Sequence, residues 1–128
     1  MDLKVFLVED LHGMRGLLAD LFSSLGGLTL AGYARTEAEA KLWLAEHPGE
    51  WDVAIVDLVL DQGSGMEVLR RCRAEPGGGK VVVFSSYATP GVRRHCMELG
   101  AAAVFDKSET AAFIGWFCAL RDQGCPNS

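Results

Sequence analysis

The feature that most constrains the fold of this 128-residue chain is an apolar run, Val53-Ala54-Ile55-Val56, that ends abruptly in Asp57. A β-branched run of this length predicts a strand buried on both faces, as in a parallel sheet covered by helices. In such a sheet, the residue that follows a strand lies at the mouth of a ligand crevice. Asp57 is therefore a candidate for chemistry, although strands also end in aspartate simply because the chain turns there.

Similar apolar runs alternate along the chain with segments whose apolar residues recur at the three- and four-residue spacing of helices. We expect strands at 3–8, 28–34, 51–57, 80–84 and 102–105, and helices at 14–25, 36–46, 64–75, 89–99 and 108–121. The last four helices are expected to begin at capping hydroxyl residues, Thr36, Ser64, Thr89 and Ser108. This alternation requires right-handed crossovers and predicts a parallel sheet with helices on both faces.

Length and composition allow one domain with its own core, since 49% of the residues are hydrophobic. We place the domain at 1–123 and regard 124–128 as a C-terminal tail or the start of a linker. A net charge of −5 without a basic block argues against direct nucleic-acid contact. The N-terminal sequence predicts neither a signal peptide nor a membrane span, and four scattered cysteines are typical of reduced thiols in a cytoplasmic protein.

Polar residues follow four of the predicted strands. Because parallel strands open at the same edge of a sheet, we expect Glu9, Asp10, Asp57, Ser85 and Lys107 to converge there. Carboxylates gathered in this way repel, by about 4 kcal/mol for two charges roughly 4 Å apart at an effective dielectric of about 20. A hard, oxygen-preferring cation such as Mg²⁺ relieves that repulsion and leaves coordination positions open for phosphoryl oxygens.

Phosphoryl transfer is the chemistry that this set of residues favours. An aspartyl carboxylate such as Asp57 can act as a nucleophile and form an acyl phosphate. Ser85 supplies a hydroxyl donor and Lys107 a fixed positive charge, which a transferred phosphoryl group needs. Taken singly, each residue has a plainer interpretation as a solvated strand end, a turn hydroxyl or a surface charge. Their occurrence at the ends of separate strands favours the functional interpretation.

With these residues the chain, from residue 4 to about 120, resembles the receiver domain of response regulators in two-component signalling. The matching residues are Glu9-Asp10, Asp57, Gly63-Ser64-Gly65, Ser85 and Lys107. The resemblance implies a flavodoxin-like (βα)5 fold, whose five-stranded parallel sheet has the order 2-1-3-4-5 and carries helices on both faces.

The resemblance also implies a role for each matching residue. Glu9, Asp10 and Asp57 hold Mg²⁺ together with the backbone carbonyl of Val59. Asp57 accepts a phosphoryl group from a phosphohistidine of a sensor histidine kinase or phosphotransfer protein. The residues that bind the phosphoryl oxygens are Ser85 and Lys107. Such a domain is a phosphoacceptor switch, not a turnover enzyme, and it controls partner binding or dimerisation and thereby an output, often transcription.

The chain departs from the family pattern three residues before Lys107, where the family usually places Tyr or Phe and this chain has Val104. Phe105 comes one position later and is expected, by strand alternation, on the other face of the sheet. Signalling is then expected to depend on the loop and helix after Ser85. Two further residues are expected to flank the site, Val59 and Tyr87.

The last predicted helix carries a wide apolar surface. Phe113, Trp116, Phe117 and Leu120 form a stripe at helical spacing, and Ile114 with Cys118 widens it. In the family, the face made by the fourth helix, fifth strand and fifth helix binds partners. We therefore predict that this face forms a homodimer or a partner surface.

The receiver interpretation has two forms, and two other classes of protein stay open on the sequence alone. As a receiver, the chain is either a complete single-domain regulator or phosphate shuttle, or the receiver piece of a longer protein. A receiver-like scaffold that binds its partner without phosphorylation is favoured slightly by Val104 and disfavoured by the full acidic set. A metal-dependent hydrolase is the weakest candidate, because no residue is evidently placed as a general base for water.

Overall fold

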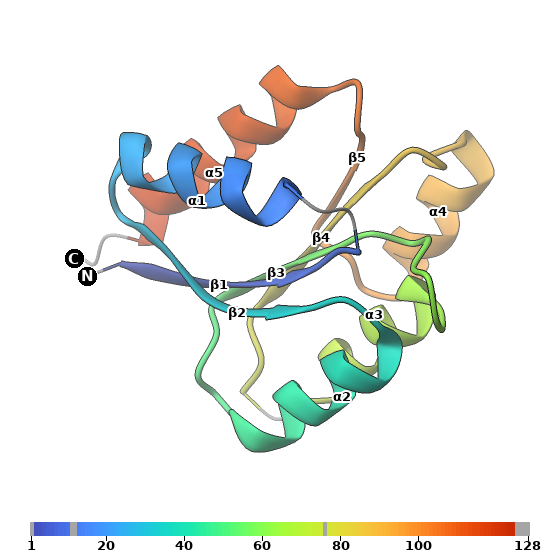
Figure 1. Cartoon of the computed structure of the whole chain (residues 1–128). Helices are drawn as coiled ribbons and strands as arrows, with labels where there is room; N and C mark the ends of the chain where they lie inside the picture. The colour runs from blue at the N-terminus through green and yellow to red at the C-terminus, as the bar shows by residue number, and fades with distance from the viewer. Residues whose placement is uncertain (1, 11–12, 76, 125–128) are drawn as a thin grey trace.

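The computed structural model describes residues 2–10, 13–75 and 77–124 of the chain. Strands and helices alternate in the order expected from the sequence (Figure 1). The strands are β1 (Leu3–Val8), β2 (Leu28–Ala34), β3 (Val53–Val56), β4 (Lys80–Ser85) and β5 (Ala103–Asp106). The helices are α1 (Met14–Leu25), α2 (Glu37–Glu46), α3 (Gly65–Ala74), α4 (Pro90–Glu98) and α5 (Thr110–Gly124).

The strands form one parallel sheet in the order β2-β1-β3-β4-β5. Helices α1 and α5 cover one face of the sheet, and α2, α3 and α4 cover the other (Figure 1). All four residues of β3 are buried, as expected for a central strand between two helical layers. The predicted flavodoxin-like (βα)5 fold and its strand order are confirmed.

The two faces of the sheet have cores of different character. The core under α1 and α5 is built around aromatic rings, with Phe84 stacked on Phe113 at a centroid distance of 4.1 Å and Phe22 packed on Phe117 at 5.6 Å. The core under α2, α3 and α4 consists mainly of aliphatic and small side chains. Its aromatic members are Phe6 and Trp51, and Trp43 of α2 stacks on Phe6. The aromatic core consequently anchors the two helices that frame one side of the sheet's carboxyl edge.

The side chains of β5 alternate between these cores. Val104 packs against the aliphatic core, whereas Phe105 packs against the aromatic core and meets Phe113 edge to face at 6.0 Å. The expectation that the two residues face opposite sides is confirmed. Phe105 therefore does not supply an aromatic ring on the face of the sheet where Val104 lies.

The predicted apolar stripe of α5 belongs mostly to the core. Phe113 and Phe117 are each only 1% exposed. Ile114, Trp116 and Leu120 are half-buried and pack against the same aromatic core. Packing against the sheet thus accounts for the stripe, and the predicted homodimer through α4, β5 and α5 remains a prediction.

Three of the four predicted helix caps are confirmed. The hydroxyl groups of Thr36, Ser64 and Thr89 accept hydrogen bonds from backbone N–H groups two or three residues further along. The cap at Ser108 is wrong. Its N–H and hydroxyl groups both donate to the carboxylate of Asp106, at 2.9 and 2.8 Å, and the helix begins two residues later, at Thr110.

The remaining differences lie at element ends. Strand β3 is shorter than the predicted 51–57, although Asp52 N–H still donates to Lys4 O and Asp57 N–H to Val8 O. Helix α5 continues to Gly124, the first residue assigned to the tail, and the rest of that tail, 125–128, lies outside the described residues. Among the described residues, none of the helices has the length and apolar character needed to cross a membrane.

Candidate functional site

The carboxyl edge of the sheet places the predicted site residues next to one another. Glu9 and Asp10 follow β1, Asp57 follows β3, Ser85 ends β4, and Lys107 follows β5. Backbone bonds continue the parallel pairing just past the strands: Asp57 N–H donates to Val8 O at 3.0 Å, and Lys107 N–H to Ser85 O at 3.1 Å. These bonds determine where each side chain leaves the sheet.

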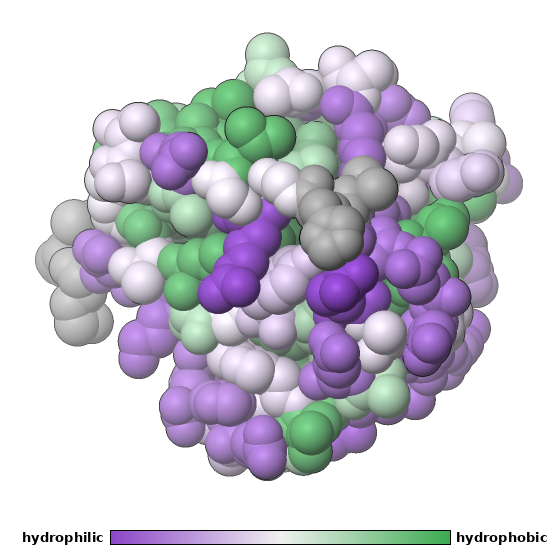
Figure 2. Space-filling view, in the orientation of Figure 1, coloured by the Kyte–Doolittle hydropathy of each residue, from purple (hydrophilic) through white to green (hydrophobic). Residues whose placement is uncertain are grey.

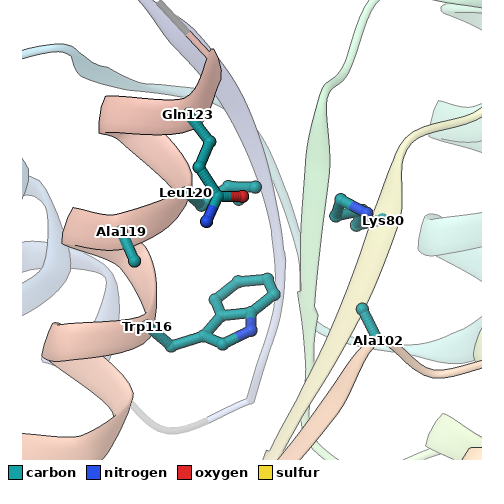
Figure 3. A pocket seen from close by; sticks show the side chains of 6 residues that line it. All are labelled: Lys80, Ala102, Trp116, Ala119, Leu120 and Gln123. Atoms are coloured by element: carbon teal, nitrogen blue, oxygen red, sulfur yellow. The ribbon is translucent and has the colours of Figure 1, made fainter.

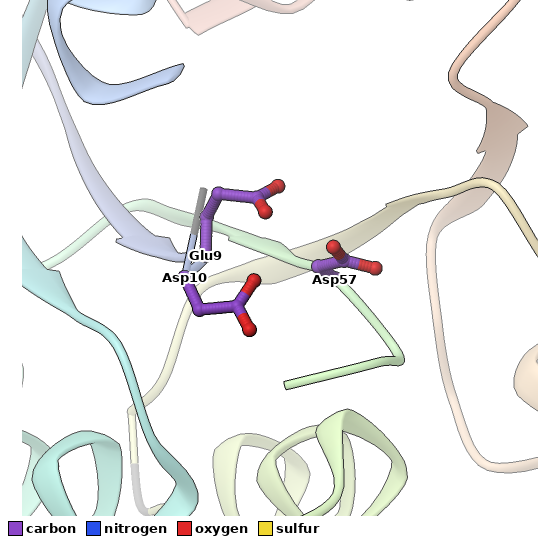
Figure 4. A group of neighbouring side chains, drawn as sticks. All are labelled: Glu9, Asp10 and Asp57. Atoms are coloured by element: carbon purple, nitrogen blue, oxygen red, sulfur yellow. The ribbon is translucent and has the colours of Figure 1, made fainter. Parts of the chain in front are cut away.

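Three carboxylates gather at this edge. One oxygen from each of Glu9, Asp10 and Asp57 lies within 4.8 Å of the others (Figure 4). Glu9 is 2% exposed and Asp57 5% exposed, whereas Asp10 is half-buried. Oxygen ligands at this spacing, partly withdrawn from water, fit a hard divalent cation such as Mg²⁺.

Lys107 joins two of these carboxylates. Its Nζ donates to Asp57 Oδ2 and lies equally close, at 2.9 Å, to Glu9 Oε1. Because the lysine starts from the end of β5, its side chain reaches across β4 to the acids of β1 and β3. The lysine thus offsets part of the repulsion among the carboxylates.

Burial and this ion pair shift the pKa values of the group. Burial raises the pKa of Glu9 from 4.5 to about 7, the hydrogen bond from Lys107 opposes the rise, and the charge of Asp57 adds to it. For Lys107, burial alone would lower the pKa, yet the hydrogen bonds to Asp57 and Glu9 outweigh it and the pKa is raised. The lysine is therefore charged at neutral pH, whereas Glu9 takes up a proton close to neutral pH.

The other oxygen of Asp57 faces the loop between β3 and α3. Val59 N–H donates to Asp57 Oδ1 at 3.2 Å, and Val59 pairs with Ser64 in an antiparallel bridge that closes the loop. Gly65 is required here, because a Cβ on it would lie 1.9 Å from the carbonyl oxygen of Asp57. Of the expected Gly63-Ser64-Gly65 segment, Gly65 therefore packs directly against the backbone of Asp57.

A pocket of about 240 Å³ opens beside Asp57. It is lined by Asp10, Asp57, Val59, Ser86, Tyr87 and Lys107. The expectation that Val59 and Tyr87 flank the site is confirmed. Ser85 is fully buried and accepts a hydrogen bond from Tyr87 N–H at 3.3 Å, so the adjacent Ser86 is the serine that lines the pocket. Sequence reasoning did not single out Ser86, since nothing but its position after Ser85 marks it.

A second hollow lies away from these residues. It measures about 190 Å³ and lies between α5, the first residue of β4 and Ala102, which directly precedes β5 (Figure 3). Its lining residues are Lys80, Ala102, Trp116, Ala119, Leu120 and Gln123. None of the predicted site residues reaches it, so the chemistry of the chain is concentrated at the carboxyl edge.

Comparison with known proteins agrees with this geometry. The family model for the response regulator receiver domain matches residues 5–114. The chain is 32% identical over 108 residues to the protein-glutamate methylesterase/protein-glutamine glutaminase of Treponema denticola, which covers 83% of the chain and 28% of that protein. It is 26% identical over 107 residues to sporulation initiation phosphotransferase F of Bacillus subtilis, covering 84% of the chain and 83% of that protein.

A solved structure of similar fold comes from the P1 domain of CheA3 in complex with CheY6 from R. sphaeroides. One of its chains matches with a TM-score of 0.71 and 27% identity, covering 91% of this chain and 97% of that one. The chain therefore belongs to the family of response regulator receiver domains, which act in two-component signalling. The match spans only 28% of the methylesterase, so the activity of that whole protein is not carried over to this chain.

Proposed function

We propose that Asp57 accepts a phosphoryl group from a phosphohistidine of a histidine kinase or phosphotransfer protein, in a reaction that depends on Mg²⁺. The observation that carries the proposal is the position of Asp57, buried at the base of an open pocket between two further carboxylates and a lysine. Glu9, Asp10, Asp57 and the carbonyl of Val59 would hold the metal ion. Bound there, Mg²⁺ supplies positive charge that neutralises phosphoryl oxygens.

The chain's own residues perform the rest of the transfer. An oxygen of the ionised Asp57 carboxylate attacks phosphorus, the new P–O bond forms as the P–N bond to the donor histidine breaks, and the electron pair leaves with the imidazole nitrogen. The Lys107 ammonium, already 2.9 Å from Asp57, provides a fixed cation for the phosphoryl oxygens. Ser85 would also contribute its hydroxyl, after a shift of the loop that now buries it.

The phosphodonor is expected to dock on the apolar groove between α1 and α5. This groove measures about 330 Å³, is lined by α1 residues including Met14, Leu17 and Leu21, and ends at Lys107. Figure 2 shows hydrophobic atoms gathered over these two helices. Leu17 is 68% exposed and adjoins other apolar residues of the same groove, and a contiguous apolar patch of this kind marks an interaction surface. An apolar helix of the donor would cover it and bring the phosphohistidine to Asp57.

The output would be a change in partner binding or dimerisation through α4, β5 and α5, as part of a cytoplasmic pathway that often controls transcription. The chain acts in this proposal as a phosphoacceptor without multiple turnover. Because its net charge is −5, we expect any contact with nucleic acid to be made by another domain or by a partner.

Intact-mass spectrometry after incubation with acetyl phosphate tests the proposal. We expect one phosphoryl adduct that requires Mg²⁺ and is lost in Asp57→Asn. The matched control is Asp61→Asn, which alters an exposed aspartate of the same loop and should keep the adduct. No adduct on a folded protein that binds Mg²⁺ would favour a scaffold that works without phosphorylation. Repeated release of phosphate from small phosphoesters would indicate a hydrolase.

A further inference from the structure

The loop between β3 and α3 is attached to a helix that contributes nothing else to the site. Glu37, the first residue of α2, accepts a hydrogen bond from Ser64 N–H through Oε1 at 2.9 Å. Its own N–H donates to the carbonyl of Gln62 at 3.1 Å. One residue thus makes two hydrogen bonds to a loop that is 25 or more positions away in the sequence.

The contact between Glu37 and the loop is close and well supported. A Cβ on Gly63 would lie 2.3 Å from Cβ of Glu37, and Gly63 has a φ of +88°, so the loop passes directly over the helix start. Lys41 Nζ holds the second oxygen of Glu37, Oε2, at 2.6 Å. The Glu37 side chain is only 22% exposed. The carboxylate is therefore held in the position that accepts from Ser64.

Ser64 connects this contact to the site. It pairs with Val59 in the antiparallel bridge, and Val59 N–H donates to Asp57 Oδ1 at 3.2 Å. Burial does not hold Val59 in place, because this residue is 48% exposed. The bridge to Ser64 sets the direction of its backbone. A bond from Gly65 N–H to Leu58 O at 3.1 Å closes this bridge, and Glu37 holds its Ser64 side.

We propose that Glu37 is a positioning residue that orients the backbone carbonyl of Val59 toward the acidic cluster and thereby sets the affinity of the site for Mg²⁺. This inference rests on the metal set of the proposed function. Hydrogen bonds that orient metal ligands typically change metal affinity by about 10- to 100-fold when removed. Since Glu37 acts on Val59 only through Ser64, we expect an effect near the lower end.

The experiment compares Glu37→Ala, Glu37→Gln and the control Glu46→Ala, which alters an exposed glutamate at the other end of α2. Calorimetric titration gives the dissociation constant for Mg²⁺, and the adduct assay gives the Mg²⁺ concentration for half-maximal phosphorylation. We expect Glu37→Ala to weaken Mg²⁺ binding about tenfold and leave the phosphorylation rate at saturating Mg²⁺ unchanged. Glu37→Gln keeps the acceptor oxygen for Ser64 and should bind Mg²⁺ within about twofold of the parent chain.

A general loss of structure gives a different pattern from a positioning role. Hydrogen exchange of the Ser64 amide, measured without metal, should become faster in Glu37→Ala and stay slow in Glu37→Gln. The inference is overturned if Glu37→Ala binds Mg²⁺ as tightly as Glu46→Ala, or if Glu37→Gln is as impaired as Glu37→Ala. The proposed phosphorylation fails separately, when the parent chain binds Mg²⁺ but forms no adduct, and the titration still decides the role of Glu37.

Discussion

Two of the segments around the Asp57 carboxylate each hydrogen-bond a different one of its oxygens, and they are held in place by different means. The loop after β3 reaches Oδ1 through Val59. The bond from Gly65 N–H to Leu58 O and the Glu37 carboxylate of α2 hold that loop. The turn after β5 reaches Oδ2 through Lys107, and a network centred on Arg93 of α4 holds that turn.

The network on the turn side is the more extensive one. The Arg93 guanidinium donates to Ala88 O at 2.9 Å, Val104 O at 3.1 Å and Glu109 Oε1 at 2.6 Å. The same Glu109 oxygen accepts from Asp106 N–H at 2.8 Å. Arg93 therefore connects the loop that follows Ser85, the strand β5 and the turn that carries Lys107.

The two oxygens of Asp57 are therefore connected to different parts of the fold. The contacts of Oδ1 lead through Val59 and Ser64 to the start of α2, away from the face formed by α4, β5 and α5. The contacts of Oδ2 lead through Lys107 to a turn that is bonded to α4. One of these contacts is the bond from the Arg93 guanidinium to the backbone carbonyl of Val104, the residue that stands where the family usually has an aromatic ring.

The largest expected effect comes from breaking the turn side at Lys107. Lys107→Ala leaves the buried carboxylates of Glu9 and Asp57 without the ammonium that now pairs with both. At pH 8 without Mg²⁺, we expect the free energy of unfolding to fall by about 3 kcal/mol, because buried charges lose their partner. Urea unfolding measures it, and saturating Mg²⁺ should restore part of the loss.

Lys80→Ala is the matched control for this prediction, because Lys80 is an exposed lysine at the start of β4, at the other end of the sheet. It should unfold within about 0.5 kcal/mol of the parent chain. Equal urea midpoints for the two lysine variants would mean that Lys107 does not stabilise the cluster.

The next largest effect is a pH dependence of stability that arises from Glu9, a member of the acidic cluster that also contacts Lys107. Because folding raises the pKa of Glu9 from 4.5 to about 7, its contribution to stability is complete below pH 4.5 and is lost as the pH rises through about 7. With a chelator present to remove metal ions, we expect the free energy of unfolding of the parent chain to fall by roughly 2 kcal/mol between pH 5 and pH 8, relative to Glu9→Gln. Urea midpoints at the two pH values measure this difference, and parallel pH profiles would contradict it.

Most of the fold follows from local pattern. The strand β3 and the stripe of α1 are readable because periodicity and β-branched runs are properties of neighbouring residues. The start of α5 is not readable in this way. Ser108 is a good capping residue, but the carboxylate of Asp106 binds its N–H and hydroxyl first. Two local interactions compete there, and the sequence does not show which one prevails.

The candidate site is likewise predictable from the sequence only in part. Glu9, Asp10, Asp57 and Lys107 converge because parallel topology places strand ends at one edge, and topology follows from the element pattern. The burial of Ser85 and the exposure of Ser86 depend on the path of a loop, which has no periodicity. The contacts of Glu37 and Arg93 join segments distant in sequence, so only the folded chain reveals which charged residues support the site.

The smallest expected effect is the loss of stability in Arg93→Ala, on the opposite side of Asp57 from Glu37. Arg93→Ala removes three hydrogen bonds from a guanidinium that is 36% exposed, so we expect a loss of only about 1 kcal/mol in unfolding free energy. The adjacent exposed Arg94 provides the control, since Arg94→Ala should change stability by less than about 0.5 kcal/mol. Urea unfolding measures both values.

Metal affinity then separates the two sides of Asp57. Arg93 lies on the side of Lys107, so Arg93→Ala should bind Mg²⁺ within about twofold of the parent chain, whereas Glu37→Ala should bind it about tenfold more weakly. Calorimetric titration of the two variants side by side makes the measurement. If Arg93→Ala weakens Mg²⁺ binding as much as Glu37→Ala does, the two oxygens of Asp57 share one support, and the loop and the turn respond to the metal as a unit.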